Sequence, residues 1–463
     1  MTSRRSPGVA AFLSFLWPGL GQLFSGRRVW ALLFALPAVA VTLPVVYEAW
    51  AQGPVVFLAR FAVANLCLLA LALIVVVGLL RIASVVHAYF TADRSRVRGR
   101  FNVGILAVLL VAIVGMHGVG GLVAWDTYQF DTKVFSSDEF TLPPDTSDSP
   151  GASVSVLPKP TEMPTPSGSP TPKSARITIL LIGLDLQQSH TDSMIVASID
   201  PDTKQVSMVS VPRDTSQFPL YWGGTAPAIA CGTTFKLNYF MKFAVKGCFP
   251  APDPPMRALE NEVGYLVGVH IDYWAEANFA GFSDLVNHLP AGNGQPKGKL
   301  CVTNPNVISD ATYDWPDSDK FGFYLSAGYH CLDGRNTLAY ARDRHGYDGG
   351  GNNDYKRSSR QQQVLVELFK RVKTEGPGDL LQFEHDVAGV IHTDFPPEKV
   401  SEMVALGQDI PPSDIDSYVL APPKYTVSGV YCLKLDQVAL LSVQLYGEDS
   451  RYYHITQPPN CGS

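Results

Sequence analysis

Lysine is absent from the first 125 residues, and acidic residues are almost absent. Ten arginines stand there against only Glu48 and Asp93, which gives this part a net charge of +8. The remainder carries 36 − 10 = 26 bases and 42 − 2 = 40 acids, a net charge of −14. General binding of nucleic acid needs a positive face. The acidic majority of the chain is therefore a poor candidate for that function.

Several motifs of well-known enzyme classes are also missing. The sequence contains no GxSxG elbow, no Walker A motif, and no CxxC or HxxxH spacing. These absences argue against a hydrolase built on a nucleophile elbow, a P-loop nucleotide hydrolase and a zinc site of the common spacings. No internal repeat is visible either, so a solenoid is not expected.

Cysteine is sparse in the first half and gathers in the second. Cys67 lies in an apolar run, and the other six cysteines follow residue 230. An even set in an exported domain predicts disulfides, although six cysteines allow 15 pairings and free thiols are the alternative. We predict sequential pairing: Cys231–Cys248, Cys301–Cys331 and Cys432–Cys461.

Three long apolar runs predict membrane helices within a membrane region at residues 1–125. Residues 29–47, 61–80 and 103–125 are free of charge. Each is near the ~20 residues that a helix needs to cross a bilayer. Residues 8–24 are also apolar but are interrupted by Pro18, Gly19 and Gly21. We interpret this segment as interfacial or re-entrant, and whether it crosses the membrane stays open.

The arginines predict the orientation of these helices. Arg81, Arg94, Arg96, Arg98 and Arg100 lie between the second and third apolar runs. Positive loops remain in the cytoplasm. The N-terminus is therefore expected in the cytoplasm, and everything after the third run is expected outside it, in a multi-pass cell-membrane protein.

Residues 126–175 are rich in Pro, Ser, Thr and Asp. Such a composition cannot bury a core, so it predicts a disordered spacer. Residues 176–463 then form the folded extracytoplasmic domain. Its apolar patterns mix strands and helices without strict alternation, which predicts an α/β (α+β) fold with a mixed central sheet flanked by helices. We expect strands at 176–184, 193–200, 205–212, 269–277 and 414–420, and helices at 256–268, 278–289, 332–342, 354–373, 377–392 and 396–408.

Residues 342–361 concentrate positive charge in an acidic domain. Asp354 is a good N-cap for the helix that follows, yet Lys356, Arg357 and Arg360 then lie in its first two turns. Bases near the positive end of a helix dipole are unfavourable by some tenths of a kcal/mol each. A solvated charged face is the common alternative, but it does not explain this placement. A bound anion would explain it.

The spacing of the arginines favours a pyrophosphate as that anion. Arg342 and Arg344 point the same way if the chain is extended there. Arg357 and Gln361 share a helix face, and guanidinium groups fit phosphate oxygens. Further charges close predicted strands at Asp185, Asp192, Arg213 and Asp214. The aspartates could hold Mg²⁺, although aspartate at a strand end is also ordinary turn chemistry.

Several segments together resemble the LytR-CpsA-Psr family of bacterial cell-envelope phosphotransferases. They include "LLIGLD", "TDSMIVASIDPDTKQVSMVSVPRDT", "KLNYF", "LDGRNTLAYARDR" and "DYKRSSRQQQVL". The resemblance covers about residues 176–370 in the family's order. Members of this family usually have a cytoplasmic N-terminus, a membrane span and an extracytoplasmic domain.

The resemblance implies an activity and its partners. Such proteins transfer a glycopolymer from a polyprenyl-pyrophosphate carrier to peptidoglycan, forming a phosphodiester link. The carrier's chain would occupy an apolar groove, which the helices at 256–267 and 279–289 could line. Matching positions imply Asp185 and Asp192 as ligands of Mg²⁺ (or Mn²⁺). The implied pyrophosphate contacts are Arg213, Arg342, Arg344, Arg357 and Gln361, with Lys236 a weaker candidate; Arg213, Arg342, Arg344 and Asp354 are the implied catalytic set.

One position departs from the family pattern, and two other functions remain open. Many members have arginine where this chain has His190, which puts one pyrophosphate contact in doubt. One alternative is a pyrophosphatase that uses water as acceptor. The other is a scaffold that binds lipid-linked glycan without turnover, which would need the arginines but could dispense with Asp185 and Asp192. The polymer, the acceptor sugar, the general base and the oligomeric state stay undetermined at this stage.

Overall fold

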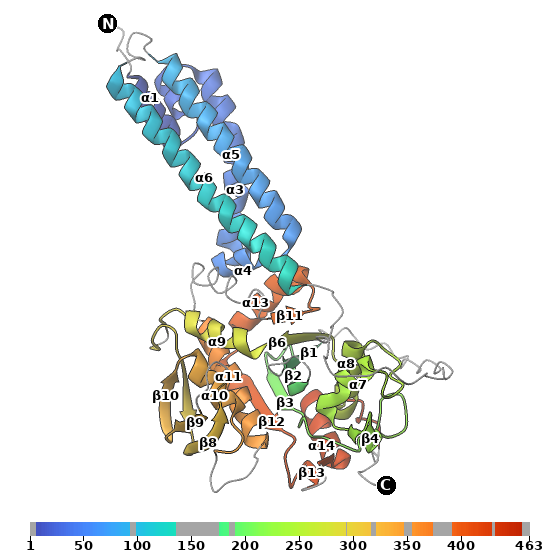
Figure 1. The fold of residues 1–463 in the computed structure, drawn as a ribbon. Helices are drawn as coiled ribbons and strands as arrows, with labels where there is room; N and C mark the ends of the chain where they lie inside the picture. The colour runs from blue at the N-terminus through green and yellow to red at the C-terminus, as the bar shows by residue number, and fades with distance from the viewer. Residues whose placement is uncertain are drawn as a thin grey trace. The chain divides into compact units, whose positions relative to one another are not determined.

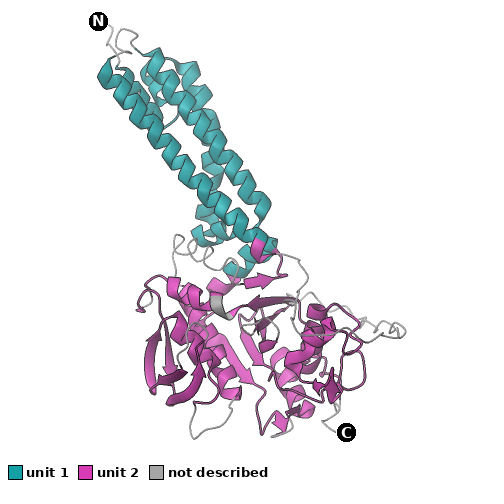
Figure 2. Ribbon diagram, in the orientation of Figure 1, with its two compact units in different colours: residues 1–132, 397–404 teal, residues 133–396, 405–463 magenta. Residues whose placement is uncertain are grey.

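A computed structural model describes residues 6–92, 99–135, 176–184, 190–292, 294–315, 321–346, 354–373, 391–427 and 431–455. The chain forms two compact units, one of residues 1–132 with 397–404 and one of residues 133–396 with 405–463 (Figure 2). Each unit is treated by itself below. Most of the predicted spacer, residues 136–175, lies outside the described residues.

The first unit is helical. Three of its helices, α3 (Arg28–Gln52), α5 (Ala64–Thr91) and α6 (Arg100–Val134), are long and apolar enough to cross a membrane. α3 and α6 contain the first and third predicted runs, and α5 contains the second from Ala64 onward, so a helix is confirmed in each run. Arg81 lies inside α5 rather than in the loop after it, and its Nη2 donates to the carbonyl oxygen of Phe15 at 2.6 Å. Shorter helices are α1 (Pro7–Leu16), α2 (Leu20–Phe24) and α4 (Pro54–Ala59).

The interrupted segment near the N-terminus folds as α1 and α2, which pack against α5. Polar atoms hold this contact: Gln22 Nε2 donates to Ser84 O at 2.8 Å, and the hydroxyl of Ser14 donates to Gln22 Oε1 at 2.9 Å. A Cβ added at Gly21 would lie 1.9 Å from the carbonyl oxygen of Ala10. The approach of the two short helices therefore requires glycine at this position.

A six-stranded mixed sheet organises the second unit (Figure 1). Its order is β11-β6-β1-β2-β3-β12, with β1–β6 and β3–β12 parallel and the other neighbours antiparallel. The predicted strands are confirmed, and residues 191–199 and 206–210 form the expected hairpin. The strands are β1 (Ile177–Leu184), β2 (Thr191–Ile199), β3 (Val206–Ser210), β6 (Tyr273–Ala277), β11 (Ile391–Thr393) and β12 (Ile415–Val419).

Helices lie on both sides of this sheet (Figure 1), as the mixed pattern of the sequence predicts. On one side the main core joins the sheet to α7 (Phe240–Val245), α8 (Pro255–Val267) and α14 (Leu435–Tyr446). On the other side lie α9 (Phe279–His288), α10 (Gly334–Arg342) and α11 (Asp354–Lys373). These three helices share a second core with two hairpin-like sheets. α13 (Val400–Asp409) is also helical, as predicted.

The two small sheets pack beside α10 and α11 and were not predicted. β7 (Leu300–Asn304) pairs with β10 (Gly328–Leu332), and β8 (Ile308–Asp314) pairs with β9 (Phe321–Leu325). The sequence analysis also missed α7 and α14. Two shorter ladders complete the unit: β4 (Ile229–Ala230) with β5 (Thr233–Thr234), and β13 (Thr426–Val427) with β14 (Cys432–Leu433).

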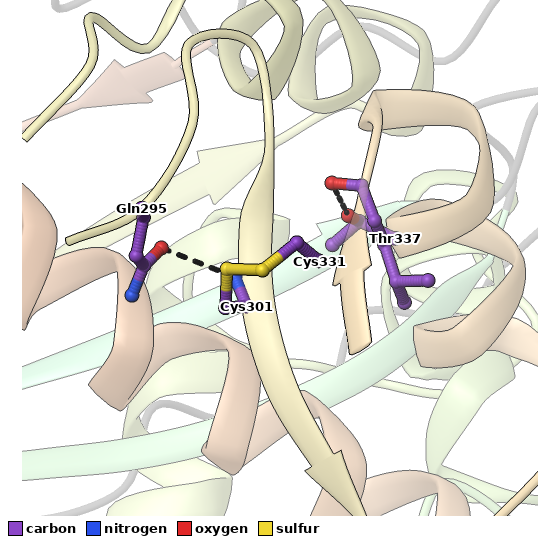
Figure 3. The surroundings of a disulfide bond; sticks show 5 residues. Gln295, Cys301, Cys331 and Thr337 are labelled. Carbon is purple, nitrogen blue, oxygen red and sulfur yellow. Dashed lines mark hydrogen bonds between the residues drawn. A yellow bond between two sulfur atoms is a disulfide. The ribbon is translucent and has the colours of Figure 1, made fainter. Parts of the chain in front are cut away.

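Two of the three predicted disulfides are confirmed, Cys231–Cys248 and Cys301–Cys331. The second joins paired residues of β7 and β10, and Gln295 Oε1 accepts a hydrogen bond of 3.1 Å from the backbone N–H of Cys301 (Figure 3). Cys432 is also disulfide-bonded, but its predicted partner Cys461 lies outside the described residues. Cys67 is buried and outside the disulfides, and its thiol donates to the carbonyl oxygen of Phe61 at 3.0 Å.

One predicted helix is partly wrong. Of residues 377–392, only Ile391 and His392 are described, and both belong to strand β11. Antiparallel pairing with β6 places His392 opposite Glu276. Sheet pairing therefore overrides the helical periodicity at this end of the segment.

Candidate functional site

The carboxylate of Asp354 lies between two arginines from different parts of the chain. Asp354 is the first residue of α11, and its side chain is 7% exposed. Its Oδ1 lies 3.0 Å from Nη2 of Arg357, one turn along the helix, and 3.5 Å from Nε of Arg213, which follows β3. The predicted helix start thus brings one acid and one base of the motif onto the same turn.

Asp192 connects the same two arginines to β2. Nη1 of Arg213 forms an ion pair with Asp192 Oδ1. Nη2 of Arg357 donates to the main-chain carbonyl oxygen of Asp192 at 2.7 Å. The start of β2, the end of β3 and the start of α11 therefore meet at one point. Four predicted residues, Asp192, Arg213, Asp354 and Arg357, form this cluster, which we call the Asp354 cluster.

Lys236 is linked to the Asp354 cluster through Asp214, the residue after Arg213. Its Nζ pairs with Asp214 Oδ1 at 2.9 Å and lies 5.6 Å from the centre of the Tyr431 ring. The backbone N–H of Asn238 donates to the carbonyl oxygen of Arg213 at 2.9 Å, which ties this loop to the arginine. Lys236 thus neutralises Asp214 beside the cluster.

The pKa values of Arg357, Asp354 and Arg213 are shifted by burial and by neighbouring charges. Burial lowers the pKa of Arg357, against the raising effect of Asp354. It raises the pKa of Asp354, against the lowering effect of Arg357 and Arg213. Burial alone would also lower the pKa of Arg213, but Asp192, Asp354 and Asp214 outweigh it and raise that pKa. Arg357 and Arg213 therefore oppose the effect of burial on the carboxylate of Asp354.

The cluster keeps unused hydrogen-bonding capacity. Both carboxylate oxygens of Asp354 are buried and make no hydrogen bond to any described residue, although they lie at ion-pair distance from arginines. The same holds for Nε of Arg213 and Nε of Arg357. Buried polar atoms without partners are rare in folded proteins. Their presence here marks a site that could bind a charged ligand.

Arg342 and Arg344 lie at the C-terminal end of α10. Arg342 is the last helical residue, and Asp343 continues in an extended conformation. Both arginines are half-buried. α11 holds this end: Gln361 Nε2 donates to Ala341 O at 3.2 Å, and Arg360 Nε donates to Tyr340 O at 2.7 Å. The arginine pair is thus anchored to the helix that carries the Asp354 cluster.

The remaining predicted residues have different outcomes. Arg360 is buried and binds the α10 end, which is a structural role. Asp185 lies outside the described residues. His190, the departure from the family pattern, packs its ring edge-on to Tyr239 with centroids 4.7 Å apart.

An apolar cavity of about 180 Å³ adjoins these charged residues. Strands β1, β2 and β6 and helices α9, α10 and α11 supply its walls. Ala341, next to Arg342, and Gln361, one turn from Arg357, both line it. The cavity therefore ends where the arginines begin. Other lining residues include Leu181, Ile195, Phe282, Leu338, Val364 and Ile391.

Of the two helices predicted to line an apolar groove, one contributes to this cavity and the other does not. Phe282 of α9 lines the cavity, but no residue of α8 does; Leu259 and Val263 of α8 lie in the main core instead. Glu276 is an unexpected member of the wall. Burial raises the pKa of Glu276 to about 7, and its Oε2 has no hydrogen-bond partner among the described residues.

The acids of the site match the chemistry of a hard divalent cation. Mg²⁺ takes carboxylate oxygens as ligands, and the cluster contains Asp192 together with the orphaned oxygens of Asp354. No group of three or more metal-ligating side chains occurs within the described ranges, and these do not include Asp185. The predicted pair of Mg²⁺ (or Mn²⁺) ligands, Asp185 and Asp192, therefore stays a prediction, and Asp192 is paired with Arg213 in this structure.

Sequence reasoning missed several residues around the site. Tyr355 follows Asp354, and its pKa rises to about 12 because of burial and the neighbouring Tyr431, Asp354 and Asp214. Glu276 lies in an otherwise apolar strand, and its acidic side chain was the only indication in the sequence that it could belong to a site. Asp343 stands between the two predicted arginines, and that position was the available signal.

Fold and site together define a class of protein. A mixed α/β domain carries an arginine–aspartate cluster beside an apolar cavity, and its chain also holds three helices of membrane-spanning length. These features describe a mixed α/β domain on a chain with candidate membrane helices. The profile of the LytR_cpsA_psr family matches residues 157–446, more than half of the chain. The chain belongs to this family.

Individual relatives agree with the family match. Over 275 residues the chain is 27% identical to an Enterococcus faecalis protein named polyisoprenyl-teichoic acid–peptidoglycan teichoic acid transferase TagU, covering 58% of this chain and 69% of that one. It is 30% identical to the Staphylococcus aureus regulatory protein MsrR over 201 residues, 42% of this chain and 49% of that one. The chain thus spans about half the length of MsrR. The crystal structure of Bacillus subtilis TagV aligns with a TM-score of 0.43 at 20% identity, over 59% of this chain and 96% of that one.

Proposed function

We propose that this protein transfers a glycopolymer from a polyprenyl-pyrophosphate carrier to peptidoglycan and joins them by a phosphodiester. One observation carries the proposal: the apolar cavity ends at the arginines. Ala341 and Gln361 line the cavity, and Arg342 and Arg357 follow on the same helices. An isoprenoid pyrophosphate has the matching form, with an apolar tail and a charged head. The name of the Enterococcus faecalis relative supports the same reaction.

The charge of the site supports an anionic ligand. Arg213, Arg357 and Lys236 contribute three positive charges, and Asp192, Asp214 and Asp354 contribute three negative charges, so these six groups sum to zero. Arg342 and Arg344 add two positive charges beside them. This surplus is suited to phosphate oxygens, because guanidinium groups bind them with two parallel hydrogen bonds.

The reaction follows from this arrangement. A sugar hydroxyl of peptidoglycan attacks the phosphorus nearest the polymer, a new O–P bond forms, and the bond to the bridging oxygen breaks. Polyprenyl phosphate leaves with the electron pair. Arg213, Arg342 and Arg344 stabilise the charge that develops on the phosphate oxygens. When bound at Asp192 and Asp185, Mg²⁺ (or Mn²⁺) would neutralise part of the same charge.

The hydroxyl proton needs an acceptor, and two acids are near. Asp214 is already paired with Lys236 at 2.9 Å. Asp354 has carboxylate oxygens without hydrogen bonds, and burial raises its pKa. A raised pKa makes a carboxylate a better base at neutral pH. This contrast favours Asp354 as the proton acceptor over Asp214.

The proposal includes an orientation. The arginine-rich stretch between α5 and α6 would lie in the cytoplasm, following the positive-inside rule. The domain after α6 would then lie outside, with access to peptidoglycan. The two disulfides of that domain support an oxidising compartment.

Incubation of the full-length chain with a polyprenyl-pyrophosphate-linked glycan, Mg²⁺ and peptidoglycan fragments tests the function. Mass spectrometry should detect a joined product whose mass includes one bridging phosphate, together with polyprenyl phosphate. Free glycan phosphate without a joined product would instead identify a pyrophosphatase. Tight lipid binding with neither product would identify a scaffold. Either of these two results refutes the transfer reaction.

A further inference from the structure

Asp343, between Arg342 and Arg344, is 1% exposed and forms a buried acid pair with Asp310 of β8. The two side chains are hydrogen-bonded to each other. Two carboxyl groups can share a hydrogen bond only when one of them holds a proton, because an ionised carboxylate has no donor. Below about pH 6 the pair therefore contains one proton and one negative charge.

The surroundings place the proton on Asp343. Asp310 Oδ1 accepts from the backbone N–H of Thr312 at 2.8 Å and from its hydroxyl at 2.7 Å. Burial alone would raise the pKa of Asp310, but these donors and His345 hold it below its ordinary value. Burial and the hydrogen bond with Asp310 raise the pKa of Asp343 to about 6, against the opposing effect of Arg360.

Further contacts attach the segment after Arg344 to β8. The backbone N–H of Ser309 donates to Gly346 O at 2.6 Å, and the N–H of Gly346 lies 3.3 Å from Asp343 Oδ1. A Cβ added at Gly346 would lie 2.8 Å from the backbone nitrogen of Asp310. Gly346 therefore lies directly against Ser309 and Asp310 of β8.

Other charged and titratable groups surround the pair from every packed element. From α11, Arg360 donates to the carbonyl oxygen of Asp343 and lies 3.5 Å from its Oδ2. From β8, Tyr313 interacts with both Arg342 and Asp343. His345 Nδ1 lies 3.7 Å from Asp310 Oδ2. Arg342 and Arg344 are the sequence neighbours of Asp343 itself.

We propose that Asp310 and Asp343 are positioning residues, whose shared proton fixes the Arg342–Arg344 segment in the conformation that binds pyrophosphate. Neither acid touches the ligand; they act through the arginines on either side of Asp343. The inference rests on the proposed pyrophosphate site and adds a residue pair and a proton to it. It also gives β8 and β9, which are not part of the central sheet, a role in the site.

The proposal predicts a pH dependence with a definite sign. Loss of the proton leaves two negative charges side by side in a buried place. The pKa of Asp343 is higher in the folded chain than its ordinary value, so the attachment is strongest at low pH. It weakens as the pH rises through about 6. Asparagine at position 343 keeps a donor for Asp310 at every pH and should remove this dependence.

Calorimetric binding of inorganic pyrophosphate to the full-length chain in detergent tests the proposal. Wild type, Asp343→Asn, Asp310→Asn and Asp343→Ala are compared near pH 5 and near pH 8, with Asp314→Asn as control, since Asp314 is an exposed acid of the same strand. The ratio of two affinities at one pH cancels the titration of pyrophosphate itself. Both paired asparagine variants should match wild type near pH 5 and bind about threefold or more tighter than wild type near pH 8. Asp343→Ala should bind about tenfold weaker than wild type near pH 5, and the difference should shrink near pH 8, where the wild-type attachment is itself weaker.

Three results would overturn the inference. Ratios that do not change with pH would show that no proton is shared. Affinity of Asp343→Ala equal to wild type near pH 5 would show that the pair does not position the arginines, while the proposed function would stand. Failure of wild type to bind pyrophosphate at any pH would remove the proposed function and this inference with it. Thermal unfolding separates failure of the pyrophosphate site from absence of the shared proton, because a shared proton makes Asp343→Asn gain stability over wild type from pH 5 to pH 8 whether or not pyrophosphate binds.

Discussion

Arg357 donates a hydrogen bond of 2.7 Å to the main-chain carbonyl oxygen of Asp192, across 165 residues of sequence. The same guanidinium lies 3.0 Å from the carboxylate of Asp354 and is 3% exposed. Arg357 therefore joins β2 to α11 as well as supplying charge to the site. Its loss would leave Asp354 buried beside one arginine instead of two.

Arg357→Ala should consequently affect stability as well as turnover. Removing one partner of a buried ion pair costs about 3–5 kcal/mol. We expect a lower free energy of unfolding by about that amount in denaturant titrations of the full-length chain, together with loss of transfer. An unchanged denaturation midpoint would contradict the buried contacts of Arg357.

Arg342→Ala should affect turnover without the loss of stability expected for Arg357→Ala. Arg342 is half-buried at the end of α10, so its truncation should leave thermal unfolding nearly unchanged. Turnover should fall by about 100-fold or more, as for loss of a group that stabilises transition-state charge. Arg335→Ala is the matched control, because Arg335 lies on the same helix and stacks 4.1 Å from the Trp315 ring, away from the cavity. Equal activity of the two variants would refute the role of Arg342.

The buried acid Glu262 should make stability depend on pH. Burial raises the pKa of Glu262 to about 8, against the opposing effects of the Tyr221 N–H and Arg451. The folded chain therefore holds this proton after the unfolded chain has lost it, and stability falls as the pH rises from about 4.5 to about 8, by up to about 1.4 kcal/mol per pH unit. Glu262→Gln should reduce that slope in thermal unfolding. Burial also raises the pKa of Glu260 to about 8, so Glu260 adds its own contribution to the pH dependence of stability. Glu260→Gln should remove that contribution and leave the one from Glu262.

Reduction of the disulfides should destabilise the second unit. The bonds close segments of 17 and 30 residues. Chain-entropy arguments give about 3 to 4 kcal/mol for each bond of such a length. The double substitution Cys301→Ala and Cys331→Ala should lower the denaturation midpoint measurably, whereas Cys67→Ala, which breaks no disulfide, is the control. Equal midpoints for the two variants would contradict a structural role for the Cys301–Cys331 bond.

The cavity should select for long apolar chains. Ala277 of β6 lines it, and phenylalanine at this position would fill part of its volume of about 180 Å³. Ala277→Phe should raise KM for a long-chain polyprenyl pyrophosphate about tenfold, roughly the cost of excluding a few methylene groups. Inhibition by inorganic pyrophosphate should stay unchanged. If Ala277→Phe weakened inhibition by pyrophosphate as much as it weakened binding of the polyprenyl substrate, the variant would be misfolded and the cavity would not be shown to bind lipid.

The sequence predicted the parts of this structure that depend on local pattern. The apolar run at 177–184 became the central strand β1, and the amphipathic pattern at 354–373 became α11. The meeting of Asp192, Arg213, Asp354 and Arg357 followed only from the resemblance to a family. Spacing alone cannot bring Asp354 and Arg357 to a pair of residues that lies more than 140 positions earlier in the chain.

Other features could not be predicted because they depend on contacts across the chain. Asp310 binds Asp343 from a small sheet that the sequence analysis did not anticipate. Ile391 and His392 form a strand because β6 offers them an edge for pairing. The proton of Asp343 follows from burial, which only the packed structure determines. Such features need the tertiary arrangement rather than periodicity.

The most direct measurement of the central claim is an experimental structure of the full-length chain with a bound polyprenyl pyrophosphate. We predict both phosphates within hydrogen-bonding distance of Arg213, Arg342 or Arg344. We also predict the isoprenoid chain inside the cavity lined by Leu181, Phe282 and Val364. Phosphates bound elsewhere, with these arginines not contacting them and the cavity empty of lipid, would contradict the account.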